Sequence, residues 1–307
     1  MTNSFGPEEK ILRQISALFN EESPVAGEVL IGDDAAVLKA FTGNAVISTD
    51  VAVWGVHLDS DLFTLEDFGF KALASAVSDI AAMGAWIRAA VIGVSAPTGT
   101  DLEALHRGIS EASYYTGCRI VGGDLTTSPT LSVAVTVFGE CPEGTALLRS
   151  GARPGDTLLV TGPLGRSAAG LRRRREGRGT SDELVQAHAR PIPRLREGLL
   201  ARWAGAHALM DLSDGLGLDL HRMADASGVG FALMQVPVAE GATLEEAISG
   251  GEDYELLIAT DTPDVLIERF VSEGKSAPLV LGEVVADVSV RTLGEKAFEK
   301  RGWQHEL

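Results

Sequence analysis

The chain has 307 residues, of which 45% are hydrophobic and 22% are charged, and its formal net charge is −17. This length favours two domains of about 150 residues each, and the composition is typical of a globular protein and unlike that of disordered or membrane-spanning chains. The excess of 43 Asp and Glu over 26 Lys and Arg argues against a nucleic-acid-binding surface.

The N-terminal stretch, residues 1–19, mixes charged and apolar side chains and lacks the basic start and apolar block of a signal peptide. Cys118 and Cys141 are the two cysteines, and they do not form a C-x-x-C pair. This cysteine usage fits a reducing compartment. We therefore expect a cytoplasmic protein that does not associate with membranes.

In the first half of the chain, three short runs rich in β-branched residues predict strands, at residues 44–49, 118–122 and 130–139. Apolar side chains at helical spacing predict helices over residues 65–83 and 101–116. Because strands and helices alternate, this half is predicted to be an α/β domain.

The segment from residue 143 to residue 156 is rich in Gly, Pro and Arg, a composition that favours turns. It predicts a domain boundary, which gives domains 1–142 and 143–307. Helices are expected near 165–204 and between the strands that follow. The strands predicted in this half lie at 157–161, 207–211, 229–236, 254–260 and 278–287. The basic run at 172–175 is interpreted as a solvated helix end.

Aspartates follow four apolar, strand-like runs, at Asp34, Asp50, Asp124 and Asp211. A strand end is a rigid platform, and neighbouring glycines allow close approach of a phosphate, so the pattern suits Mg²⁺ bound to a polyphosphate. Each aspartate alone could be a helix N-cap or a turn former. Their recurrence favours the ligand interpretation.

Two further acidic features also favour the ligand interpretation. Asp79 lies inside an otherwise apolar predicted helix, where an unpaired buried carboxylate would cost several kcal/mol. The run Gly-Gly-Glu-Asp-Tyr-Glu at 250–255 predicts a tight turn that aims a carboxylate at a small ligand.

The turn at 162–167 either holds an anion on its backbone N–H groups or is an ordinary strand-to-helix turn. The P-loop pattern and the protein-kinase signatures are absent, so any ATP site here must depend on metal ions. The six histidines are scattered, and His57, seven residues after Asp50, is the one of interest.

Taken in order, these motifs resemble the thiamine-monophosphate kinase family over nearly the whole chain. They are Gly32-Asp33-Asp34, Ser48-Thr49-Asp50, Ser78-Asp79, Gly122-Gly123-Asp124, Asp211-Leu212-Ser213-Asp214-Gly215, Gly250-Gly251-Glu252-Asp253-Tyr254-Glu255 and the tail Gly302-Trp303-Gln304-His305. The tail helps to separate this family from aminoimidazole ribonucleotide synthetase, selenophosphate synthetase and a hydrogenase maturation factor of the same superfamily.

The resemblance implies a two-domain aminoimidazole ribonucleotide synthetase-like fold, α/β followed by α+β. The N-terminal sheet is expected to pair with its copy in a homodimer, and the C-terminal domain to close over nucleotide and substrate. The implied reaction is transfer of a phosphoryl group from ATP to thiamine monophosphate, which gives thiamine diphosphate. It is expected to be a direct in-line transfer assisted by several Mg²⁺ ions, with no covalent catalytic residue.

The resemblance also implies roles for individual residues. The expected magnesium ligands are Asp34, Ser48, Thr49, Asp50, Asp79, Asp124, Asp211 and Asp214. The expected ATP contacts are His106, Gly123, Asp124, Arg149 and Ser213. The expected substrate contacts are His57, Glu252 and Trp303. Relatives commonly carry an Asp where this chain has Arg166, so Arg166 receives no role.

Two alternatives remain at this stage. Another enzyme of the superfamily, which activates a carbonyl oxygen as a phosphate ester, shares the aspartates but not the Trp303 tail. A selenophosphate synthetase would carry a reactive N-terminal Cys, and none precedes Cys118. A noncatalytic metal-binding relative would have lost part of the acidic set, which is nearly complete here.

Overall fold

The computed structural model describes residues 7–19, 27–31 and 35–304. The chain divides into two compact units, the first made of Met1–Val77 and Ile87–Glu140, the second of Ser78–Trp86 and Cys141–Leu307. The predicted domains differ from these units mainly in the segment Ser78–Trp86, which the sequence pattern did not separate from the first half. Over the described ranges, no helix is long and apolar enough to cross a membrane.

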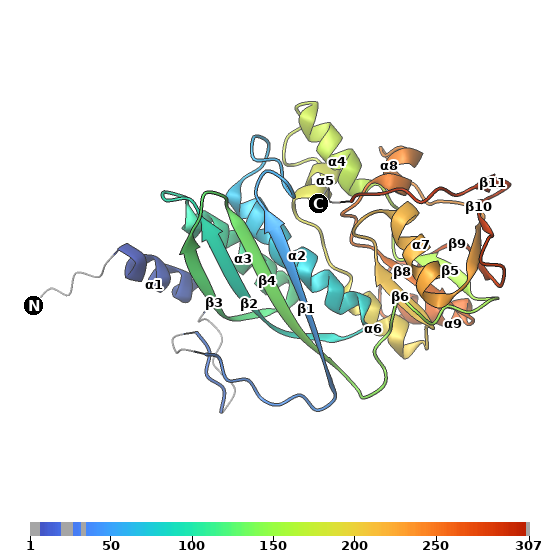
Figure 1. The fold of residues 1–307 in the computed structure, drawn as a ribbon, viewed down its shortest axis with the longest axis horizontal. Helices are drawn as coiled ribbons and strands as arrows, with labels where there is room; N and C mark the ends of the chain where they lie inside the picture. Colours follow the sequence, from blue (N-terminus) through green and yellow to red (C-terminus); the bar gives the residue numbers. More distant parts are fainter. Residues whose placement is uncertain (1–6, 20–26, 32–34, 305–307) are drawn as a thin grey trace, which may run out of the picture. The chain divides into compact units, whose positions relative to one another are not determined.

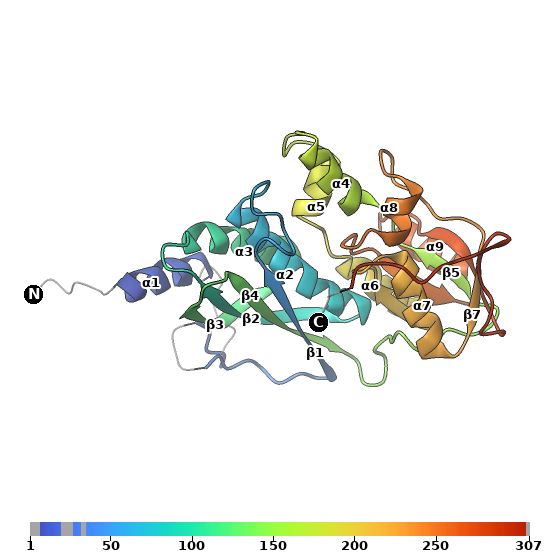
Figure 2. The same cartoon turned by 45° about the horizontal axis from the view of Figure 1, so that its top comes forward.

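The first unit is built on a four-stranded sheet in the order β1-β4-β2-β3 (Figure 1). Its strands are β1 (Asn44–Val53), β2 (Trp86–Ala96), β3 (Arg119–Thr127) and β4 (Ser132–Cys141). Its helices are α1 (Pro7–Phe19), α2 (Leu65–Ala82) and α3 (Leu102–Thr116), and α2 and α3 lie on one face of the sheet (Figure 2). Every second residue of β4 from Val133 to Val137 is buried, because that side of the strand faces these helices.

The second unit is built on a seven-stranded sheet in the order β11-β10-β7-β9-β5-β8-β6. Its strands are β5 (Thr157–Val160), β6 (Ala208–Asp211), β7 (Gly230–Leu233), β8 (Leu256–Thr260), β9 (Leu279–Val285), β10 (Arg291–Leu293) and β11 (Lys296–Ala297). Its helices are α4 (Arg166–Arg175), α5 (Glu183–Ala189), α6 (Leu195–Trp203), α7 (Leu216–Ser227), α8 (Leu244–Ser249) and α9 (Pro263–Ser272). Most neighbouring strands are antiparallel, as in an α+β domain.

Both faces of this sheet are covered by apolar side chains. In β8, Leu257 belongs to a hydrophobic cluster that includes Leu220 of α7, whereas its neighbour Ile258 belongs to another cluster, with Leu200 of α6 and Phe270 of α9. Successive strand residues point to opposite faces, so helices pack on both sides of the sheet. This explains why β8 is an unbroken apolar run in the sequence.

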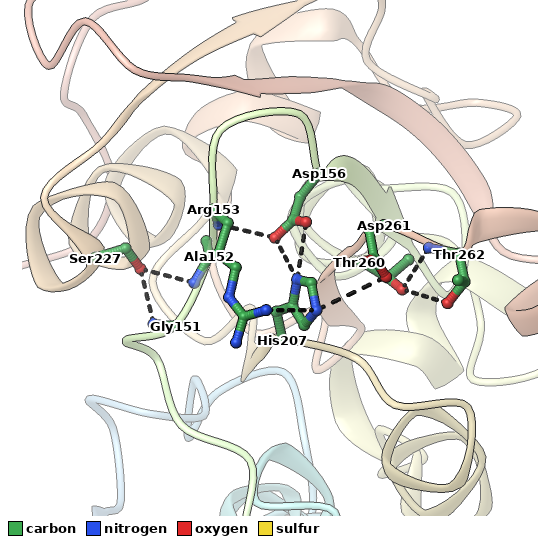
Figure 3. Close-up of polar contacts among 9 residues, drawn as sticks. All are labelled: Gly151, Ala152, Arg153, Asp156, His207, Ser227, Thr260, Asp261 and Thr262. Atoms are coloured by element: carbon green, nitrogen blue, oxygen red, sulfur yellow. Dashed lines mark hydrogen bonds and ion pairs between the residues drawn. The ribbon is translucent and has the colours of Figure 1, made fainter.

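An acid and a histidine connect the starts of β5 and β6 (Figure 3). Asp156 precedes β5 and is 1% exposed, and its Oδ1 lies 2.8 Å from Nδ1 of His207, which precedes β6. The second oxygen of Asp156 accepts the Arg153 N–H at 2.8 Å. Asp211 lies at the other end of β6, so this pair stabilises the sheet away from the predicted ligands.

The structure corrects the expectation that each aspartate follows the end of a strand. Asp50 lies within β1, which continues to Val53, and Asp124 lies within β3, which continues to Thr127. Asp211 is the last residue of β6, as expected. Polar and small residues do not end a strand when the backbone remains paired with its neighbours, which a reading of side-chain types alone does not detect.

Candidate active site

In the second unit, Asp79 and Asp211 form an acidic pair. Ser78 Oγ donates a hydrogen bond to Asp211 Oδ2 at 2.7 Å, and both residues are buried. Burial and the nearby Asp79 carboxylate raise the pKa of Asp211 to about 7, against the lowering effects of the Ser78 hydrogen bond and the positive charge of Arg149. Since ionising both carboxylates is unfavourable, a divalent cation would relieve the repulsion.

The neighbouring Asp214 has a different environment. Its carboxylate is paired with Arg222, whose guanidinium also contacts Asp219 at 2.8 Å. Asp219 is fully buried and accepts hydrogen bonds from the N–H groups of Asp214 and Gly215 at 3.0 and 3.1 Å. The turn is therefore rigid, and a metal ion at Asp214 would share the carboxylate with Arg222.

Three segments far apart in the sequence meet beside this turn. The Glu252 N–H donates to the Ser213 carbonyl at 2.8 Å, and the Trp303 N–H donates to the Asp214 carbonyl at 2.9 Å. Trp303 is 53% exposed, so about half of its surface is accessible. The second unit therefore brings together the predicted substrate residues Glu252 and Trp303 and the predicted nucleotide residue Ser213.

Two acidic side chains of the turn at 250–255 fix it to neighbouring parts of the second unit. Asp253 accepts the N–H groups of Gly165 and Ser167 at 2.6 and 2.9 Å, and Glu255 is paired with Arg194. Of the two interpretations of the 162–167 turn, the ordinary strand-to-helix turn is therefore the better one, because the chain's own carboxylate occupies the N–H groups that an anion would need. The sequence pattern alone does not indicate these roles of Asp253 and Glu255.

Burial raises the pKa of Asp253 to about 7, although the hydrogen bonds from the Ser167 and Gly165 amides lower it. The backbone of the same turn is unusual as well: Glu252 and Tyr254 have φ angles of 67° and 50°. Non-glycine residues adopt such angles at a cost of about 1–3 kcal/mol each, so the surrounding contacts must determine this conformation.

In the first unit, the predicted ligands are carried by strands of one sheet. Thr49 Oγ1 of β1 lies 3.1 Å from Thr136 Oγ1 of β4, and Asp124 of β3 is paired in register with Gly93 of β2. The run of Ser48, Thr49 and Asp50 lies in β1, and Gly123 and Asp124 are exposed on β3. Asp34 lies outside the described residues.

The two histidines of the first unit differ. His57 Nδ1 accepts the Val53 N–H at 3.0 Å, which leaves the ring hydrogen on Nε2. His106 is 5% exposed, its Nδ1–H donates to the Leu102 carbonyl at 2.7 Å, and its ring meets Phe19 edge-on. Burial lowers the pKa of His106. Its contacts are those of a core residue, and no described contact supports the predicted role at ATP.

Among the described side chains, no group of three or more His, Cys, Asp or Glu residues is arranged to hold a metal ion. Magnesium is commonly bound by one or two carboxylates, with water and phosphate oxygens completing its octahedron. The acidic pair of Asp79 and Asp211 fits that pattern.

Comparison with known proteins decides the family. The model of the AIR synthase related protein N-terminal domain matches residues 32–141, and that of the C-terminal domain matches residues 153–293. The thiamine-monophosphate kinase of Mycobacterium tuberculosis is 37% identical over 281 residues, which cover 89% of this chain and 84% of the relative. This chain belongs to the thiamine-monophosphate kinase family. The resemblance seen in the motifs is thereby confirmed, and the chain is a kinase-family enzyme.

Solved structures of this kinase family confirm the fold. The thiamine-monophosphate kinase from Stenotrophomonas maltophilia K279a superposes with a TM-score of 0.83 at 30% identity, covering 95% of this chain and 98% of its own. AaThiL complexed with AMPPCP and TMP superposes with a TM-score of 0.77 at 29% identity, covering 90% and 92% of the two chains. The expected α/β plus α+β architecture of the AIR synthase related proteins is therefore correct.

Proposed function

We propose that this protein transfers the γ-phosphoryl group of ATP to thiamine monophosphate and so forms thiamine diphosphate. The observation that carries the proposal is the similarity to thiamine-monophosphate kinases along nearly the whole chain, including the relative that binds both AMPPCP, an ATP analogue, and thiamine monophosphate. A cytoplasmic location is part of the proposal, and the free, buried state of Cys118 and Cys141 is consistent with it.

The second unit supports the substrate assignment. Trp303 exposes about half of its surface beside the turn that carries Glu252, and an indole face attracts a flat, positively charged ring. The thiazolium ring of thiamine monophosphate is such a group. Glu252 supplies a carboxylate that is partly exposed, with 27% of its side chain accessible. His57 remains the predicted substrate contact of the first unit.

The proposal includes several Mg²⁺ ions. When bound, magnesium would neutralise the phosphate charge and orient the phosphates for in-line attack. The chain's part is to supply fixed oxygen ligands, and the acidic pair of Asp79 and Asp211 is the best supported. The other proposed ligands are Asp34, Ser48, Thr49, Asp50, Asp124 and Asp214, and the proposed ATP contacts are Gly123, Asp124, Arg149, Ser213 and His106, the last without structural support.

We propose a direct in-line transfer without a general base. A phosphate monoester has a second pKa of about 6 and is already largely ionised near neutral pH, so its oxygen can attack the γ-phosphorus unaided. The transition state of phosphoryl transfer mainly requires positioning and charge neutralisation. The predicted site residues, rich in aspartates, match these requirements.

The proposal also includes a homodimer formed through the first unit. Ile47 and Val51 of β1 are 62% and 50% exposed and share one face of the strand with Thr49. The helices α2 and α3 lie on one face of the sheet (Figure 2), and the proposed contact with a second copy uses the opposite face. Exposed apolar residues in such a row are typical of an interface.

The function is tested by incubating purified protein with ATP, Mg²⁺ and thiamine monophosphate and separating the products by chromatography. We expect equal amounts of ADP and thiamine diphosphate, and no product from unphosphorylated thiamine. If thiamine diphosphate is absent but ADP and inorganic phosphate form when formylglycinamidine ribonucleotide is added, an enzyme that activates a carbonyl oxygen is favoured instead. ATP binding without turnover on any candidate substrate would favour a noncatalytic relative.

A further inference from the structure

A buried histidine of the second unit lies beside the predicted substrate carboxylate. His188 of α5 is 3% exposed, and its Nδ1 lies 2.9 Å from Ser167 Oγ and 3.6 Å from Glu252 Oε2. We propose that His188 is a positioning residue that keeps the Glu252 carboxylate aimed at the cationic, nitrogen-rich part of the substrate. This inference rests on the proposed function and adds a residue to its specificity site.

The packing of two helices fixes the histidine in this place. A Cβ atom at Gly170 of α4 would lie 1.9 Å from the Leu184 carbonyl and 3.1 Å from His188 Cβ. The backbones of α4 and α5 therefore approach as closely as glycine permits. Asp182 caps α5 by accepting the Leu184 N–H at 3.0 Å, which fixes the start of the same helix.

The backbone of Glu252 is fixed independently. Its φ of 67° and its N–H bond to Ser213 set the direction in which the side chain leaves the turn. Asp253, the next residue, accepts the Ser167 N–H, so Ser167 contacts the turn through its amide and His188 through its hydroxyl. The nearby imidazole supplies an attraction that restricts the side-chain torsions of Glu252.

The geometry also favours one position for the imidazole hydrogen. A carboxylate 3.6 Å from Nδ1 would be repelled by a lone pair on that nitrogen and attracted by an N–H group. The ring therefore carries hydrogen on Nδ1 and donates it to Ser167 Oγ, with its positive edge toward Glu252. This arrangement holds the carboxylate in one direction, as contact with a cationic ring requires.

The test is the kinetics of His188→Leu with both substrates. We expect the KM for thiamine monophosphate to rise about tenfold, the size of one lost charge-assisted contact. The kcat and the KM for ATP should stay within about twofold, because the contact concerns only substrate binding. His188→Asn, which can keep an N–H group near the position of Nδ1, should restore most of the affinity.

His221→Leu is the matched control, since His221 is also a buried histidine of the second unit and its Nδ1–H donates to the Gly217 carbonyl at 2.7 Å. This variant should leave the KM for thiamine monophosphate unchanged. Parallel changes in both Michaelis constants of His188→Leu, together with a lowered melting temperature, would show a merely structural role and overturn the proposal.

A double-mutant cycle adds a measurement that a structural role would not affect. In a Glu252→Gln background, His188→Leu should raise the KM for thiamine monophosphate by less than about twofold, because the charge on which it acts is absent. If the effects of His188→Leu and Glu252→Gln on the KM for thiamine monophosphate simply multiply in the double variant, the proposal is overturned. Absence of thiamine diphosphate formation by the wild-type protein would contradict the proposed function itself, so the two failures are distinguishable.

Discussion

Neighbouring aspartates of the second unit differ in what balances their charge. Asp214 has the guanidinium of Arg222, whereas Asp211 has the hydroxyl of Ser78 and faces the like charge of Asp79. A buried carboxylate that faces a like charge is costly. Asp79 and Asp211 are therefore the residues at which Mg²⁺ would have the largest effect.

Replacing Asp79 by Asn should lower kcat/KM by about 100-fold or more while the fold is retained, because a neutral amide is a poor magnesium ligand and one charge is lost from the site. The measurement is the steady-state rate at saturating Mg²⁺, with circular dichroism as the check on folding. Asp261→Asn, at a position whose side chain is 62% exposed, is the matched control. Near wild-type activity of Asp79→Asn would contradict the ligand assignment.

Asp253 gives a prediction about pH. Its pKa is raised by burial from 3.8 to about 7, so the folded state keeps a proton that the unfolded state releases. The stability from this group is present below pH 4 and is lost as pH rises through about 7. Urea unfolding between pH 5 and pH 8 should show a larger loss of stability in the wild type than in Asp253→Asn, which keeps the contribution of Asp211. A wild type and variant with parallel pH profiles would contradict it.

At the scale of elements, residue patterns predicted most of the helices and strands. The helices expected at 65–83 and 101–116 are observed as Leu65–Ala82 and Leu102–Thr116, because their apolar residues recur at helical spacing. The strand β2 was not predicted, since its alanines and glycine give a weak strand signal. The ends of the strands differ from the predicted ones because a strand stops where its backbone pairing stops. Side-chain types do not predict that position.

The sequence predicts the residue types of the candidate site but not the bonds within it. The acidic motifs and the Trp303 tail predict the chemistry, but the pairing of Glu255 with Arg194 is a contact between residues 61 positions apart. The association of Ser78–Trp86 with the second unit likewise follows from packing. Single-sequence patterns contain no information about such long-range partners.

The close packing of α4 and α5 gives a prediction for stability. Gly170→Ala should lower the free energy of unfolding by about 1–3 kcal/mol, because the added methyl group would collide with the Leu184 carbonyl. The control is Gly179→Ala, where the nearest atom to an added Cβ is Ser181 Oγ at 3.9 Å. Chemical denaturation measures both, and equal stability of the two variants would show that α4 and α5 do not pack as described.

At the scale of the whole molecule, the exposed face of the first sheet leads to a prediction about assembly. Val51→Lys places a charge among exposed apolar residues and should shift the protein toward monomers, with a measurable loss of the dimer in sedimentation velocity. Val271→Lys is the control, at an α9 position that is 57% exposed. A monomeric wild type, or a Val51→Lys protein that remains fully dimeric, would contradict the proposed interface.

The central claim is direct phosphoryl transfer from ATP to thiamine monophosphate. The most direct measurement is a single-turnover reaction with excess protein, Mg²⁺ and ATP labelled in its γ-phosphate. We predict that the label appears in the terminal phosphate of thiamine diphosphate as ADP forms, with none bound covalently to the protein. Label recovered as inorganic phosphate would contradict the kinase function, and label on the protein ahead of the product would contradict direct transfer.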